Sequence, residues 1–137
     1  MQDIFAAPDC AVPDSTAPRL DFEKLDVYRV AVEFHALTAS LRLPAGRREL
    51  RDQLDRAALS IVLNTAEGCG RTGAADKARF YAMARGSAME CAALFDVLAN
   101  LGLAPRPLCV RARALLVRIV QMHTRLCRNS FQNVSIS

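Results

Sequence analysis

Apolar residues recur at helical spacing through four long segments of this chain, and this periodicity limits the fold more than any other feature of the sequence. In residues 107–128 two parallel apolar rows run the length of the segment: Leu108, Ala112, Leu115, Ile119, Met122 and Leu126 in one, and Cys109, Leu116, Val120, His123 and Cys127 in the other. Steps of three and four residues place such rows on one face of an α-helix. No stretch of the sequence alternates as a half-buried strand does, so we expect an all-α fold.

Three further helical segments precede this one, at about residues 21–43, 47–67 and 76–101. The residues between the segments are those that end helices: Pro44 and Gly46, then Gly68, Gly70 and Gly73, then Gly102, Pro105 and Pro107. Because loops of roughly three to eight residues join long helices, neighbouring helices must run antiparallel. The sequence therefore predicts an antiparallel up-down-up-down four-helix bundle over residues 20–129.

The two ends of the chain differ in composition from the bundle. Residues 1–19 hold three prolines among small and acidic residues, which cannot bury enough surface to offset the cost of ordering. We expect a disordered N-terminal tail over residues 1–19 and a flexible C-terminal tail over residues 130–137.

The apolar faces are wider than one small bundle requires. In residues 107–128 the two rows cover nearly half of the helix circumference, more than the stripe of a helix that faces a single core. Tyr81, Met83, Phe95 and Val97 widen the face of the third segment in the same way. The excess apolar surface predicts contacts between copies of the chain, and hence a homo-oligomer.

Charge is distributed unevenly. The net charge is +4, but residues 1–26 carry six acids and two bases, and no acid follows Asp96. On the fourth segment one basic edge, about four turns long, borders the apolar arc: Arg111, Arg118, Arg125 and Arg128. Arginine suits bidentate contacts to phosphate, so this edge predicts salt-sensitive, weakly sequence-selective binding of an RNA or DNA backbone. A solvated flank of this helix explains the same four arginines equally well. In the second segment, two further arginines are interpreted simply as members of i, i+4 ion pairs, Arg48–Asp52 and Arg51–Asp55.

Several kinds of chemistry are not expected. Residues 68–73 match G-x-G-x-x-G, but they follow a helix instead of a strand, so we interpret them as a turn. His35 and His123 lie on apolar rows and are interpreted as packing residues. The five cysteines form no C-x-x-C pair, and no Glu-x-x-His pair occurs. We therefore expect no metal site, no cofactor, no catalytic residue and no enzymatic activity.

Polar side chains form a line along the second segment, at Gln53, Ser60, Asn64 and Glu67. Buried polar groups must be hydrogen-bonded, and the bonds then fix the register between helices. The nearest expected partners are Ser87 and Glu90 on the third segment, where Gly86 permits close approach. We predict a structural polar motif made of Ser60, Asn64, Glu67, Ser87 and Glu90.

No apolar run reaches the 18 residues of a membrane span, and the N-terminus lacks the basic start of a secretory signal. We expect a cytoplasmic protein with no membrane contact.

Three stretches are similar to a known bacterial family: LDVYRVA at residues 25–31, SIVLNTAEG at 60–68 and FYAMARGSAME at 80–90. On the basis of these three stretches, the region from about residue 22 to residue 128 resembles the 23S rRNA intervening-sequence proteins. The resemblance implies a small cytosolic four-helix bundle that assembles as a ring-like homopentamer. Some members are encoded inside insertions in 23S rRNA genes. The related accessory variability determinant of diversity-generating retroelements is a basic barrel that binds nucleic acid and a reverse transcriptase, so the resemblance also implies such partners.

By position, the residues that match the family's motifs are Ser60, Asn64, Glu67, Arg85, Gly86, Ser87 and Glu90. Arg85 lies on the opposite side of its helix from Ser87, which favours a surface or subunit contact. We expect a non-enzymatic, homo-oligomeric adaptor that binds nucleic acid through its arginines. The alternative is a protein interaction scaffold with no nucleic-acid role, and a third hypothesis, an enzyme, would need a polar pocket around Glu67 or Glu90.

Overall fold

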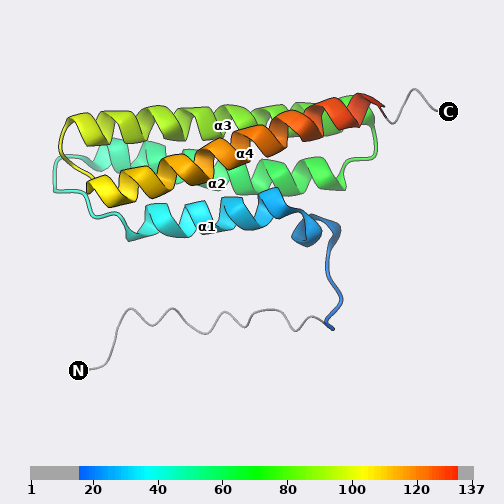
Figure 1. The fold of residues 1–137 in the computed structure, drawn as a ribbon, viewed down its shortest axis with the longest axis horizontal. Helices are drawn as coiled ribbons and strands as arrows, with labels where there is room; N and C mark the ends of the chain where they lie inside the picture. Colours follow the sequence, from blue (N-terminus) through cyan, green and yellow to red (C-terminus); the bar gives the residue numbers. More distant parts are fainter. Residues whose placement is uncertain (1–15, 133–137) are drawn as a thin grey trace.

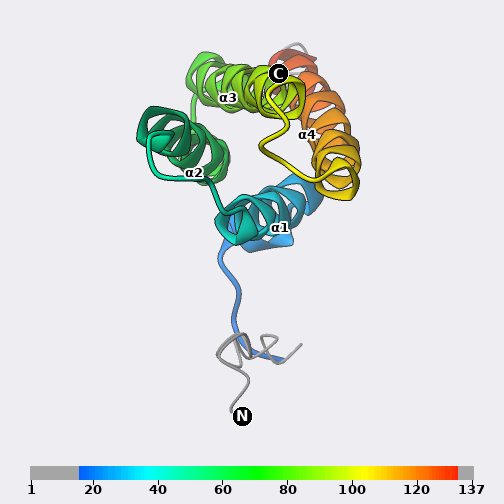
Figure 2. The ribbon, with the colours of Figure 1, turned by 90° about the vertical axis from the view of Figure 1, so that its left-hand side faces the viewer.

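The computed structural model describes residues 16–132, which fold into four α-helices that follow a short 3-10 turn. The elements are η1 (Asp21–Lys24), α1 (Asp26–Ser40), α2 (Arg48–Gly70), α3 (Ala74–Asn100) and α4 (Arg106–Gln132). Successive helices run in opposite directions (Figure 1), and α4 returns to lie beside α1 and close the bundle (Figure 2). The described residues contain no strand, and the expected all-α four-helix bundle is confirmed. Most of the predicted N-terminal tail, residues 1–15, lies outside the described residues, as do residues 133–137 of the C-terminal tail.

The first helical segment is shorter than the sequence predicts. Leu25 has an extended backbone, with φ −78° and ψ 127°, and separates η1 from α1. This break lets Phe22 pack edge-on against Tyr28, with ring centroids 4.8 Å apart. At the other end α1 stops at Ser40, because the Arg51 guanidinium donates to the carbonyl oxygens of Thr38 and Leu41 at 3.0 and 2.8 Å.

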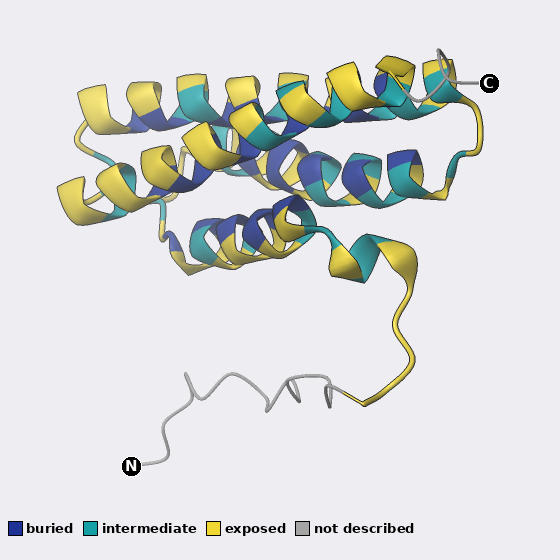
Figure 3. Cartoon of the chain, turned by 45° about the vertical axis from the view of Figure 1, so that its right-hand side comes forward, coloured by how far each residue is buried: buried dark blue, intermediate teal, exposed yellow. Residues whose placement is uncertain are grey.

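The core lies on the axis between the four helices. Figure 3 shows the buried residues along the inward sides of the helices, with exposed residues outside. Phe34 of α1 and Phe95 of α3 meet edge-on across the core, with ring centroids 6.0 Å apart. Side chains from every helix surround them, among them Val30, Leu54, Ile61, Leu98, Leu116 and Ile119. Burial of this apolar surface is the main force that holds the four amphipathic helices together.

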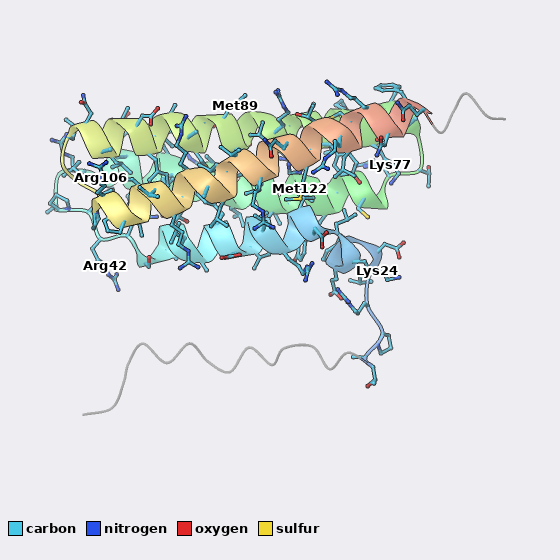
Figure 4. All side chains as sticks on the ribbon, in the orientation of Figure 1. Lys24, Arg42, Lys77, Met89, Arg106 and Met122 are labelled. Carbon is cyan, nitrogen blue, oxygen red and sulfur yellow. The ribbon has the colours of Figure 1, made fainter. Side chains whose placement is uncertain are left out.

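The second half of the G-x-G-x-x-G stretch, residues 71–73, forms the expected turn between α2 and α3, whereas residues 68–70 extend α2 beyond its predicted end at residue 67. Lys77, labelled at this end of the bundle in Figure 4, donates from Nζ to the carbonyl oxygens of Gly68 and Cys69 at 3.2 and 2.8 Å. It thereby satisfies carbonyls that the end of a helix leaves without a partner. None of the three glycines has a positive φ, so the need for glycine here is not conformational.

Gly68 is required instead by close packing between α2 and α3. A Cβ at this position would lie 2.8 Å from Cε1 and 2.9 Å from Cδ1 of the buried Tyr81 ring. The sequence favoured Gly86 as the point of close approach, and this is wrong: Gly86 is exposed, and no atom lies within 4 Å of its Cβ position.

We therefore expect Gly68→Ala and Gly86→Ala to have opposite effects. Gly68→Ala forces the Tyr81 ring to move, which costs about 1–3 kcal/mol and outweighs the gain in helix propensity. Gly86→Ala in open space gains about 0.5–1 kcal/mol from propensity alone. Urea denaturation of the two variants measures both changes. Equal effects of the same sign would refute the assignment of the close contact to Gly68.

Candidate nucleic-acid interface

The basic edge of α4 faces solvent and is only partly neutralised. Arg111 donates from Nη2 to Oε1 of Glu33 on α1 at 3.1 Å. Arg118, Arg125 and Arg128 are exposed, and no ion pair or hydrogen bond joins the guanidinium group of any of them to another residue between 16 and 132. The structure therefore divides the four predicted arginines into one that pairs within the chain and three that have no partner in its described part.

The three unpaired arginines follow from the pattern of α4. Its apolar rows turn Ala112, Leu115 and Ile119 into the core, which leaves the arginines on the solvent side. No acid lies on α4 itself, so no i, i+4 pair can neutralise them. Arg113 differs, since it points toward α3 and pairs with Asp96 at 3.8 Å.

Beside this edge, a polar contact that the sequence did not predict joins α3 to α4. Arg85 is half-buried, and its Nε donates to Oγ1 of Thr124 at 2.8 Å. The Thr124 hydroxyl in turn donates to the Val120 carbonyl at 2.8 Å. Arg85 thus lies in a contact within the chain, where its position opposite Ser87 on the helix had favoured a surface or subunit contact.

The predicted polar motif is brought together only in part. The hydroxyl oxygens of Ser60 on α2 and Ser87 on α3 lie 2.8 Å apart, and Nδ2 of Asn64 donates to Oγ of Ser60 at 2.9 Å. Glu67 instead points outward and pairs with Arg71 at 2.5 Å. Glu90 is exposed and forms no hydrogen bond or ion pair with any described residue. Three of the five residues form the link between α2 and α3, and the two carboxylates lie outside it.

A second buried polar contact, which the apolar rows did not reveal, joins α2 to α4. His123 is fully buried, with Nε2 2.8 Å from Oγ1 of Thr65 and Nδ1 3.0 Å from the Ile119 carbonyl oxygen. Burial lowers the pKa of His123 to about 4, since the charged ring would lose its hydration, and the hydrogen bond to the Ile119 carbonyl opposes this only in part. The ring is therefore neutral at pH 7.

Burial also shifts the pKa values of two other groups in the interior, Tyr81 and Cys91. Tyr81, whose ring centroid lies 6.2 Å from that of His123, has a pKa raised to about 12, first by burial and then by the nearby Cys69 thiol. Cys91, deeper in the core, has its pKa raised to about 12, mainly by burial and further by the charge of Glu90. All three groups are uncharged at neutral pH, as a packed interior requires.

The described residues also lack two other kinds of feature. Between residues 16 and 132, no three side chains of the His, Cys, Asp and Glu types gather as metal ligands would. Over the same range, no helix is both long and apolar enough to cross a membrane.

Apolar side chains remain exposed on two separate faces. On the first face, the outer side of α3 and α4, Met89 and Val117 line a groove whose walls also include Ala92, Leu116 and Val120. On the second face, Leu59 and Leu63 project from α2 with 45% and 57% of their surface exposed. The two faces differ, because the first is a groove between two helices and the second consists of exposed leucines on one helix.

Comparison with known proteins assigns the family. The model of the 23S rRNA-intervening sequence proteins matches residues 23–125, from the end of η1 to Arg125 on the basic edge. The match includes the Ser60–Ser87 link and the Arg85–Thr124 contact. No curated protein matches the chain. Since the matched region covers most of the sequence and the fold is a four-helix bundle, the chain belongs to the 23S rRNA-intervening sequence protein family.

Proposed function

We propose that this protein is a non-enzymatic, homo-oligomeric adaptor of the cytoplasm that binds the backbone of RNA or DNA through the basic edge of α4. The observation that carries the proposal is the row of three exposed arginines, Arg118, Arg125 and Arg128, which have no partner among the described residues. Guanidinium groups arranged along one helix can each contact a phosphate without reading a base.

The available aromatic rings favour electrostatic binding over base stacking. The half-buried Phe80 is flanked by the guanidinium carbons of Arg71 and Arg79, at 4.7 and 4.6 Å from the ring centroid. Phe34, Phe95 and Tyr81 lie in the core. On α4 itself a single ring, Phe131, is exposed near the basic edge, whereas single-strand binding proteins use several rings as stacking platforms.

The interior polar groups support a structural role instead of a catalytic one. Every buried side-chain nitrogen or oxygen in residues 16–132 has a hydrogen-bond partner. The two carboxylates of the family motif, Glu67 and Glu90, lie on the surface, and Glu67 is held in an ion pair with Arg71.

Two different apolar faces on one chain support assembly into a ring. If Leu59 and Leu63 of one copy pack into the α3/α4 groove of the next, the contact is head-to-tail, and such contacts form a ring when the rotation between copies closes. The homopentamer that the family resemblance implies is one such ring. Assembly would repeat the α4 arginines around the oligomer and so multiply the contacts with a polyanion. A protein partner such as a reverse transcriptase belongs to the same proposal, on the strength of the resemblance alone.

Charges placed in the groove are expected to dissociate the oligomer. The double variant Met89→Asp and Val117→Asp should sediment or elute as a folded monomer of about 15 kDa, because burial of carboxylates opposite apolar side chains is strongly unfavourable. Light scattering after size exclusion measures the mass. The matched control replaces the exposed Val32 and Ala36 of α1 by Asp and should keep the wild-type mass. Unchanged mass in the groove variant would exclude this face as the contact.

The binding proposal is tested by fluorescence anisotropy with a labelled 20-nucleotide single-stranded RNA. We expect affinity that falls steadily as salt rises, because cations released from the RNA favour binding at low salt. If the protein shows no salt-dependent binding to this RNA or to heparin, the alternative function, a protein interaction scaffold, is favoured.

A further inference from the structure

One end of the bundle is predominantly basic, with four exposed arginines and a single acid, Glu49, in the first turn of α2. The end is formed by the loop between α1 and α2 and the loop between α3 and α4, together with the first residues of α2 and α4 (Figure 1). Residues 41–48 and 99–106, which build it, contain no acid and four arginines: Arg42, Arg47, Arg48 and Arg106. Figure 4 labels Arg42 and Arg106 at this end, from different loops. We refer to these four residues as the loop-end arginines.

The loop-end arginines do not serve the fold. All four are exposed, and none of their guanidinium groups forms an ion pair or hydrogen bond with a residue between 16 and 132. The i, i+4 spacing predicted a pair between Arg48 and Asp52, but this pair does not form. Arg51 shows what a structural arginine does in the same region, since its guanidinium pairs with Asp55 and donates to two carbonyl oxygens at the end of α1.

Two of the four arginines lie where a positive charge opposes helix formation. Arg48 is the first residue of α2, where Glu49 beside it offsets part of its charge, and Arg106 is the first residue of α4, whose first turn contains no acid. The N-terminus of a helix carries partial positive charge, so a cation there is unfavourable and an anion favourable. A polyanion bound at this end would reverse the effect, because its phosphates would compensate the arginines.

We propose that the loop-end arginines form a second contact surface for a nucleic-acid backbone, continuous with the basic edge of α4. The inference rests on the proposed function, and it extends the binding site from the side of one helix around the end of the bundle. Arg106 lies 12 residues before Arg118 on the same helix, about 18 Å along its axis, a distance that a strand of a few nucleotides can bridge. A helix of 27 residues is about 40 Å long, so the combined site spans several nucleotides of a single strand.

The test compares two variants that each lose four positive charges. The loop-end variant changes Arg42, Arg47, Arg48 and Arg106 to Gln. The control changes four arginines that bond within the chain to Gln: Arg19, Arg29, Arg79 and Arg113. Affinity for the labelled 20-nucleotide RNA is measured from 50 to 300 mM salt. We expect the loop-end variant to bind at least tenfold more weakly at 100 mM, with a salt slope shallower by up to about 3, which corresponds to four lost phosphate contacts.

The control variant should retain most of the wild-type affinity and slope. If it weakens binding as much as the loop-end variant does, net charge alone explains the result and the inference is overturned. The inference is also overturned by another combination of results: wild type and the loop-end variant show the same dependence of affinity on salt, while replacement of Arg118, Arg125 and Arg128 by Glu abolishes binding. If the wild type itself does not bind, the proposed function fails first.

One substitution at the start of α4 tests the inference by two measurements together, thermal stability and affinity for the RNA. Arg106→Glu should raise the midpoint of thermal unfolding by about 2 °C, since it places an acid in the first turn of α4. The same change should weaken RNA binding. If the variant is more stable but binds the RNA more weakly, Arg106 serves binding at a cost in stability. Unchanged affinity for the RNA would contradict the inference.

Discussion

Replacement of Arg118, Arg125 and Arg128 by Glu is expected to reduce affinity for the 20-nucleotide RNA by about 100-fold or more at 0.1 M salt. Each substitution removes a contact to phosphate worth about 1 kcal/mol and adds repulsion, and about 1.4 kcal/mol corresponds to a tenfold change in affinity. Since the three side chains have no partner in the described structure, the fold should be unaffected. Anisotropy measures the affinity, and circular dichroism confirms the helical content.

The matched control reverses three arginines that already pair with acids, Arg29, Arg79 and Arg113. It changes the net charge by the same amount but should lower affinity much less. Reversal of Arg111 alone should have an intermediate effect, because Glu33 already compensates this side chain. Equal losses in the control and the α4 variant would show that binding depends on overall charge and would contradict a defined edge.

Acidification from pH 7 to pH 4 is expected to lower the free energy of unfolding by about 3 kcal/mol through His123 alone. Its pKa is about 4 in the folded chain, against 6.5 for a histidine side chain in water. Below pH 6.5 the unfolded chain takes up a proton that the folded chain excludes until about pH 4, so stability falls through this window and levels off below it. Above pH 6.5 the ring is neutral in both states and contributes no pH dependence.

The double variant His123→Leu and Thr65→Val isolates this contribution. It removes both partners of the 2.8 Å contact together, so neither is left buried without a hydrogen bond. Urea denaturation at pH 7, 5.5 and 4.5 should show a smaller loss of stability in the double variant than in the wild type. The surface carboxylates are the same in both proteins, so the difference reports on the histidine. Equal losses would mean that His123 is not the group responsible.

Helical periodicity was enough to predict the fold, because each helix buries one face and the rows of apolar residues mark that face. The pattern did not show where α1 begins and ends. Those boundaries depend on Phe22 folding onto Tyr28 and on Arg51 reaching back to the carbonyl oxygens of Thr38 and Leu41, contacts that spacing along the chain does not encode.

The candidate site was predicted less completely for a similar reason. The arginines of α4 could be found from their spacing, but the pair between Arg111 and Glu33 joins residues 78 positions apart and became visible only in the folded chain. Spacing predicted the contact between Ser60 and Ser87, yet it overextended the polar motif to Glu67 and Glu90, which rotate to the surface. The bond between His123 and Thr65 was missed because both residues lie among apolar neighbours.

The central claim, that assembled copies present a shared basic surface to a nucleic-acid backbone, is tested most directly by sedimentation velocity of the full chain with the labelled RNA. The account predicts that at 0.1 M salt the protein sediments at a multiple of 15.0 kDa and carries the RNA with it, and that 0.5 M salt releases the RNA from an intact oligomer. A 15.0 kDa monomer that leaves the label sedimenting as free RNA would contradict it.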